Sequence, residues 1–111
     1  MKKIIDGKRY NTETAEEIAA YENTWNPQDF GYYSETLYKT KKGAYFLYGE
    51  GMCRSKYGTG HGFTPLTDNE TFKWLCEYGF NKEAEKEFPE MIEDAWFQSN
   101  YGGLIRNVWT K

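Results

Sequence analysis

The sequence predicts an α+β fold in which a small antiparallel sheet is packed with two to three C-terminal helices. The strand-like segments precede the helix-like ones along the chain, an order typical of α+β domains. Short extended runs meet at Asp6-Gly7 and at Lys41-Lys42-Gly43, and both sequences are typical of hairpin turns. The chain has 111 residues, the length of one ordinary domain, so we expect a single domain over residues 1–111.

The first elements are predicted to be extended. A hairpin is expected over residues 2–11, because Asp and Gly tolerate the positive φ of a two-residue turn. Residues 15–22 follow a capping-box pattern at Thr14-Ala15-Glu16-Glu17, which favours a short helix, although a third strand also suits them. A second hairpin is expected over residues 30–48, with strands at 30–40 and 44–48.

Residues 49–65 read as a long flexible loop. The segment holds five glycines and ends at Pro65. Glycine and proline interrupt regular structure, and connections of this length are usually mobile or functional.

The last third of the chain is predicted to be helical. Thr67 and Glu70 have capping-box spacing, so a helix is expected over about 68–78. Its apolar face would contain Phe72, Leu75 and Cys76, which predicts a buried Cys76.

Further helix is expected over about 81–97. It would run to Phe88 and restart at Pro89, because proline suits the first position of a helix. Residues 104–109 could add a last strand or pack as a tail.

Aromatic residues make up 19% of the chain, with ten Tyr, seven Phe and four Trp. Because tyrosine combines an apolar ring with a hydroxyl group, we expect many of these rings to lie half-buried or at a contact surface. The second hairpin holds several of them. Exposed tyrosines are frequent in binding hot spots, so we select Tyr32, Tyr38 and Tyr48 as candidate partner-binding residues.

The net charge of −3 disfavours direct nucleic-acid binding, which usually requires a basic stripe. The charge is uneven, because residues 66–95 hold nine of the 17 acidic side chains and three of the 14 basic ones, a net −6. Four of these acids lie at helical spacing and form either a solvated face or a surface for a basic partner. They are Glu83, Glu87, Glu90 and Asp94.

The chain shows no sign of export or membrane insertion. It lacks the run of about 18 apolar residues that spans a bilayer, and Met1–Asp6 reaches an acidic residue too early for a signal peptide. We therefore expect no membrane association and a cytoplasmic location with free thiols.

Soft metal ligands are few. Cys53, His61 and Cys76 are the only cysteine and histidine residues, and they lack the close pairs of a structural zinc site. No cofactor is expected, and zinc bound by these three residues is kept as an alternative. Cys53 and His61 have no cysteine-protease signature around them, and Gly58–Gly62 lacks the Gly-Lys-Ser/Thr ending of a phosphate-binding loop. We therefore expect no enzymatic activity.

Two stretches resemble one family of small proteins. They are KIIDGKRYNTETA at residues 3–15 and SETLYKTKKGAYFLYGEG at residues 34–51, followed by Pro65-Leu66-Thr67 before an acidic helix. The family consists of accessory proteins encoded on phages and conjugative elements of Gram-positive bacteria. The resemblance covers residues 2–95, and residues 96–111 look like an extension.

Some members of this family are associated with anti-CRISPR activity, mainly against type II effector nucleases. The resemblance therefore implies a protein that binds a host CRISPR effector nuclease and occludes its nucleic-acid channel. It implies no catalytic residue. The alternative is a zinc-binding or nucleic-acid-binding regulatory accessory protein of a mobile element.

Overall fold

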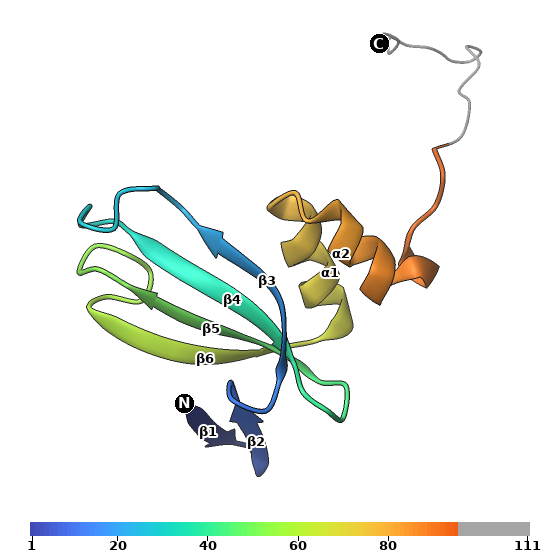
Figure 1. Cartoon of the computed structure of the whole chain (residues 1–111), viewed down its shortest axis with the longest axis horizontal. Helices are drawn as coiled ribbons and strands as arrows, with labels where there is room; N and C mark the ends of the chain where they lie inside the picture. The colour runs from blue at the N-terminus through green and yellow to red at the C-terminus, as the bar shows by residue number, and fades with distance from the viewer. Residues whose placement is uncertain (96–111) are drawn as a thin grey trace, which may run out of the picture.

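The structure is a computed structural model that describes residues 1–95. It has the α+β architecture that the sequence predicts, with the helices after the sheets (Figure 1). A two-stranded antiparallel sheet is followed by a four-stranded antiparallel sheet, whose strands lie side by side in chain order. The elements are β1 (Lys2–Ile5), β2 (Lys8–Asn11), β3 (Glu16–Glu22), β4 (Tyr33–Lys39), β5 (Tyr45–Gly51), β6 (Gly60–Leu66), α1 (Asp68–Glu77), α2 (Asn81–Glu87) and the 3-10 turn η1 (Pro89–Met91).

Both predicted hairpins are confirmed. β1 and β2 pair across a turn in which Asp6 has φ 50° and Gly7 has φ 77°. β4 and β5 pair across residues 40–44, where Gly43 has φ 92°. Both turns thus contain residues that tolerate the left-handed backbone region.

The helix favoured for residues 15–22 is wrong, and the alternative of a third strand is correct. β3 pairs with β4 along its length, with a bulge between Glu17 and Ala19. Ala19 is buried in the core. Pairing with a neighbouring strand outweighs the weak helical preference of so short a segment.

The prediction of a long loop over residues 49–65 is wrong, because strand residues occupy both ends of this segment. β5 extends to Gly51 and β6 begins at Gly60, so only residues 52–59 connect the strands. Gly49 pairs with Gly62 across the strands. The connection folds back so that the ring of Tyr57 lies against Gly49, where an added Cβ would stand 2.0 Å from the ring atom Cζ. The glycines are strand residues that make room for this ring.

α1 begins and ends as predicted. Thr67 and Glu70 form the capping box, with Glu70 Oε1 accepting from the Thr67 amide at 2.8 Å. Gly79 follows the helix with φ 80°. The prediction of a buried Cys76 is wrong, because Thr71, Trp74 and Leu75 form the buried face instead and Cys76 is exposed.

The predicted helix over 81–97 is shorter in the structure. α2 ends at Glu87, and Phe88 has φ −134° and ψ 55°. A residue before proline avoids the helical region, and Phe88 precedes Pro89. Only the turn η1 follows, and Ile92 is extended. Residues 96–97 and the segment 104–109 lie outside the described residues.

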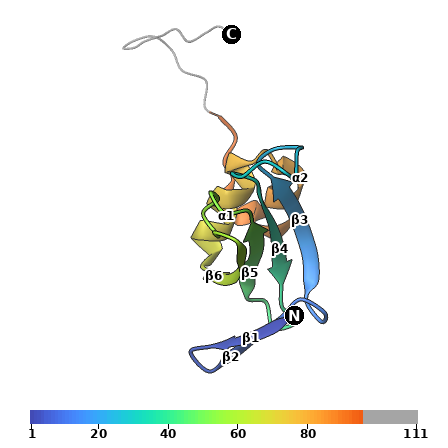
Figure 2. The ribbon, with the colours of Figure 1, turned by 90° about the vertical axis from the view of Figure 1, so that its left-hand side faces the viewer.

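The two α-helices lie against one face of the four-stranded sheet, and the β1–β2 hairpin lies across one end of the sheet (Figures 1 and 2). The core lies between this face and the helices, and it is built around Ala19, Leu37, Tyr45, Leu47, Trp74, Leu75, Ala84 and Phe88. Within residues 1–95, no helix has both the length and the apolar character needed to cross a bilayer.

Replacing Gly49 by alanine should lower the free energy of unfolding by about 2–3 kcal/mol, because the new methyl group would collide with Tyr57. Gly60→Ala is the matched control, since its Cβ would approach nothing nearer than the Tyr57 carbonyl oxygen at 3.9 Å. Urea denaturation measures both. Equal effects of the two substitutions would contradict the placement of Tyr57, as would a Gly49→Ala cost that persists in a Tyr57→Ala background.

Candidate functional site

The face of the four-stranded sheet that points away from the helices carries aromatic and acidic side chains in adjoining rows. Side chains alternate along a strand, and cross-strand partners share a face. Glu35 and Leu37 of β4 point toward the helices. The residues that alternate with them, Ser34, Thr36 and Tyr38, therefore point to the opposite side, together with their cross-strand partners. We call this surface the open face. It consists of Glu17, Ala20, Glu22, Ser34, Thr36, Tyr38, Phe46, Tyr48, Glu50, His61, Phe63 and Pro65.

Phe46 is the base of the aromatic part of the open face. Its ring lies 5.3 Å from Tyr38, 5.8 Å from Phe63 and 5.3 Å from Tyr10 of the β1–β2 hairpin, measured between ring centroids. These neighbours bury Phe46 completely. Tyr38, Phe63 and Tyr48 remain half-buried around it. The molecule thus presents a cluster of packed rings whose outer surfaces contact solvent.

The second row of the open face joins these rings to polar groups. Tyr48 lies edge-on to Phe63 with 5.1 Å between ring centroids, and it lies 5.8 Å from the His61 ring. His61 is the cross-strand partner of Glu50, and both side chains are exposed. An apolar centre with a polar border is typical of protein-binding surfaces.

Burial and nearby carboxylates together raise the pKa of two tyrosines on the open face. Burial, and then the charge of Glu17, raise the pKa of Tyr38. Burial, and then the charge of Glu50, raise the pKa of Tyr48. At neutral pH both tyrosines keep a hydroxyl proton, as any tyrosine with an ordinary pKa does, and they can donate it to a partner.

Tyr32, the third predicted tyrosine, lies just before β4. It donates a hydrogen bond to Glu22 Oε2 at 2.6 Å, and this bond is the main cause of its raised pKa. Tyr32 therefore anchors a carboxylate at the border of the open face.

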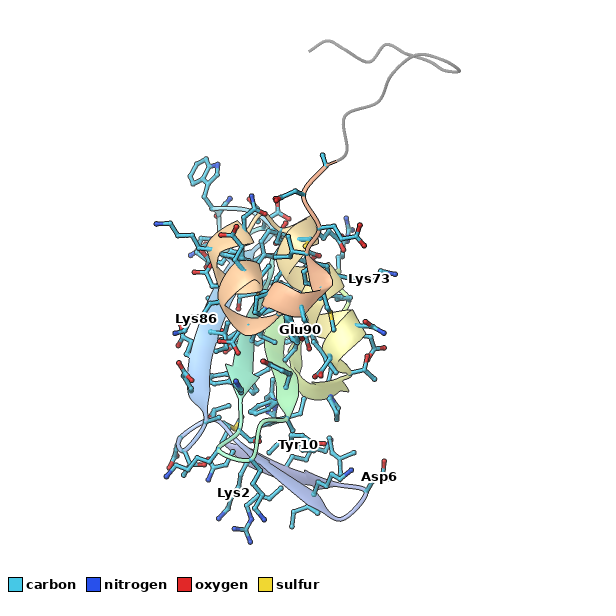
Figure 3. The ribbon with its side chains drawn as sticks, turned by 90° about the vertical axis from the view of Figure 1, so that its right-hand side faces the viewer. Lys2, Asp6, Tyr10, Lys73, Lys86 and Glu90 are labelled. Atoms are coloured by element: carbon cyan, nitrogen blue, oxygen red, sulfur yellow. The ribbon has the colours of Figure 1, made fainter. Side chains whose placement is uncertain are left out.

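The predicted acidic residues lie on the other side of the molecule, with the helices. Glu90 is on that side in Figure 3, and Glu90 and Asp94 are both exposed. Glu83 is half-buried. The structure therefore does not bring the predicted acids and the predicted tyrosines into one surface.

Glu87 has partners inside the fold. It accepts a hydrogen bond from the Tyr45 hydroxyl at 2.7 Å and pairs with Lys39 Nζ at 3.0 Å, and its side chain is 5% exposed. Burial alone would raise the pKa of Glu87, but these two donors outweigh it and lower the pKa. Glu87 thus holds α2 to the sheet.

The three predicted metal ligands do not form a metal-binding group. Among residues 1–95, no three His, Cys, Asp or Glu side chains are arranged to hold a metal ion. Cys53 is in the 52–59 connection, His61 is on the open face, and Cys76 is on α1, which covers the opposite face. The geometry gives no support to the zinc alternative built on these residues.

One strongly buried carboxylate, Glu35 of β4, invites a catalytic interpretation. It is 1% exposed, and each oxygen has donors. Oε1 accepts from Trp74 Nε1 at 2.8 Å, while Oε2 accepts from the Tyr57 hydroxyl at 2.6 Å and pairs with Lys56 Nζ at 2.7 Å. The protein itself satisfies this carboxylate, so its role is to join β4, the 52–59 connection and α1.

The prediction from sequence missed Glu17, Glu50 and Phe63 as members of the site. A local signal for Phe63 existed, because the larger residues His61, Phe63 and Pro65 alternate with small ones, a strand-like period of two. The five glycines of residues 49–65 favoured a loop and outweighed this strand signal.

No protein-family model, curated protein or solved structure matches this chain. The fold and the open face define a small α+β domain with an aromatic, acid-bordered surface, and its function is inferred from these residues.

Replacing Glu35 by glutamine should lower the free energy of unfolding by about 2 kcal/mol at pH 7, because the ion pair and part of the hydrogen bonding are lost. It should also change the pH dependence. Burial opposes ionisation of Glu35, but the bonds from Lys56, Tyr57 and Trp74 outweigh it and hold the pKa below the ordinary 4.5. The stabilisation is therefore present above pH 4.5 and is lost as the pH falls through the lowered pKa.

Urea denaturation of the wild type and of Glu35→Gln from pH 7 to acid measures this effect. The exposed Glu85→Gln is the control with the same charge change. We expect the acid loss of stability to shrink in Glu35→Gln alone. An unchanged acid loss in that variant would refute the assigned role of Glu35.

Proposed function

We propose that this chain is a non-enzymatic inhibitor that binds a CRISPR effector nuclease in the cytoplasm of a bacterial host. It would bind through the open face and occlude the nucleic-acid channel of the effector. A type II effector is the first expectation, from the resemblance of residues 34–51. The observation that carries the proposal is the cluster of half-buried rings beside exposed carboxylates on the sheet face that the helices leave uncovered.

The chemistry of the open face suits the lining of such a channel. An effector channel is positively charged because it holds the phosphate backbones of a guide–target duplex. Glu17 and Glu50 offer carboxylates to arginine and lysine side chains. Tyr38, Tyr48 and Phe63 offer ring surface for apolar contact and for cation–π contact with the same cations. Aromatic anchors bordered by carboxylates would compete with nucleic acid for the channel.

The motif that carries the resemblance belongs to this surface. Residues 34–51 make up nearly all of the β4–β5 hairpin at the centre of the sheet. Within that hairpin, Tyr38, Tyr48 and Glu50 lie on the open face. The helix side is the weaker candidate, because Glu87 is bound to Lys39 and Tyr45 and is not free to contact a partner.

Two charge-reversed variants separate the two sides of the molecule. Glu17→Lys with Glu50→Lys changes the open face, and Glu90→Lys with Asp94→Lys changes the helix side. All four residues are exposed, and both double variants change the net charge equally. In a DNA-cleavage assay with a panel of CRISPR effectors, the open-face variant should raise the concentration for half-inhibition at least ~10-fold, the cost of about 1.4 kcal/mol of binding.

The helix-side variant should inhibit like the wild type, and thermal unfolding checks that both variants fold. Loss of inhibition in the helix-side variant alone would move the contact to η1 and the residues that follow it. A wild-type protein that inhibits none of the effectors would contradict the proposed function.

A further inference from the structure

The loop between β3 and β4, residues 23–32, exposes two large aromatic side chains at one end of the sheet (Figure 1). Trp25 is 91% exposed and Phe30 is 58% exposed. Tryptophan is well buried in most folded proteins, and an indole ring left in water forgoes the stabilisation that burial would give. The other large apolar side chains that are exposed within residues 1–95 carry no ring. They are Met1, Ile4 and Ile92.

Hydrogen bonds order this loop. The Asn23 side chain joins the two ends of the loop, because its Nδ2 donates to the Gly31 carbonyl oxygen and its Oδ1 accepts from the Tyr33 amide, both at 2.9 Å. The connection between β5 and β6 braces the loop, since the Arg54 amide donates to the Phe30 carbonyl oxygen at 2.8 Å. A partner would therefore meet the rings on a loop that is already ordered, which lowers the entropic cost of binding.

The loop adjoins the acidic border of the open face. Glu22 is the last residue of β3, and its cross-strand partner Ser34 is the second residue of β4. Ser34 in turn pairs with Glu50 of β5. Tyr32, in the loop, donates a hydrogen bond to Glu22 Oε2 at 2.6 Å and so ties the loop to this border. The loop that presents Trp25 and the carboxylate of Glu50 therefore lie at the same end of the sheet, where one partner can contact both.

We propose that Trp25 is an anchor of the contact with the effector nuclease, with its indole ring in an apolar pocket of that protein while the open face contacts the surface beside the pocket. This inference rests on the function proposed above and adds a contact that the open face does not contain. A tryptophan side chain can bury about 150–250 Å². Tryptophan is enriched among the few residues that supply most of the binding energy of a protein interface.

The charge around the loop favours a protein over nucleic acid or a membrane. Proteins that stack bases on aromatic rings place them in a positively charged groove, and an anionic membrane surface also attracts clustered cations. Residues 23–32 hold one acidic side chain, Asp29, and no basic one. In the neighbouring connection, the Arg54 guanidinium lies 5.8 Å from the Phe30 ring centroid, and Lys56 is bound in an ion pair within the fold. An apolar pocket of a protein needs no such cations.

A single substitution tests the anchor. In the DNA-cleavage assay with an effector that the wild type inhibits, Trp25→Ala should raise the concentration for half-inhibition at least ~30-fold, the effect of losing a hot-spot residue. Trp25→Phe keeps an aromatic ring and should raise it less. Because Trp25 buries almost nothing within the chain, Trp25→Ala should shift the midpoint of thermal unfolding by no more than about 3 °C.

Ile4→Ala is the matched control. Ile4 is also a large apolar side chain, 66% exposed, but it belongs to β1 in the hairpin across the other end of the sheet (Figures 1 and 2). Ile4→Ala should inhibit like the wild type. Equal inhibition by Trp25→Ala and the wild type would overturn the anchor and leave the proposed function intact, as would equal losses in Trp25→Ala and Ile4→Ala. A wild type that inhibits no effector would contradict both inferences.

Two binding measurements separate the classes of partner. Fluorescence anisotropy of a labelled single-stranded DNA and sedimentation with phosphatidylserine vesicles are each measured with the full chain, at the concentrations that inhibit the effector. Neither ligand should bind. Binding of the wild type to either ligand that is lost in Trp25→Ala would overturn the proposal, because the indole ring would then serve nucleic acid or lipid.

Discussion

The carboxylate of Glu35 is the contact on which the arrangement of the sheet, the 52–59 connection and α1 depends. Its two oxygens meet Trp74, Tyr57 and Lys56, which come from segments far apart in the sequence. A buried charge is costly unless it is paired and hydrogen-bonded, so these partners must assemble together. Gly49 completes the arrangement, because its missing side chain makes room for the Tyr57 ring.

This arrangement gives the two faces of the sheet different roles. The helices and the 52–59 connection cover the face that carries Glu35. Tyr57 fixes this connection to the sheet through its hydrogen bond to Glu35. The opposite face has rings packed around Phe46 and carboxylates at its border, with no helix of the described chain upon it. Charge is separated as well, with acids on the open face and basic residues on the β1–β2 hairpin. The net charge of −3 is a sum over the whole chain, so it indicates neither of these two charged surfaces.

Local signals in the sequence predicted the elements whose ends are set locally. The Asp6-Gly7 turn, the Gly43 turn and the Thr67 capping box all appear where expected. β6 escaped prediction, and β3 was expected only as the alternative to a helix, because pairing with β4 and β5 defines these two strands. The surroundings of the predicted site residues also depend on contacts between distant segments. Glu87 looks like a free surface acid, but Lys39 and Tyr45, more than 40 positions away, are its partners. Glu17, Glu50 and Phe63 join the tyrosines only through strand register.

The central claim is that the open face, and not the helix side, contacts the partner. Hydroxyl-radical footprinting of the chain, alone and bound to an effector that it inhibits, measures the accessibility of individual rings by mass spectrometry. Oxidation of Tyr48 and Phe63 should fall on binding, while Phe72 of α1 and Met91 of η1 should be oxidised as in the free chain. Protection of Phe72 and Met91 with unchanged oxidation of Tyr48 and Phe63 would contradict it.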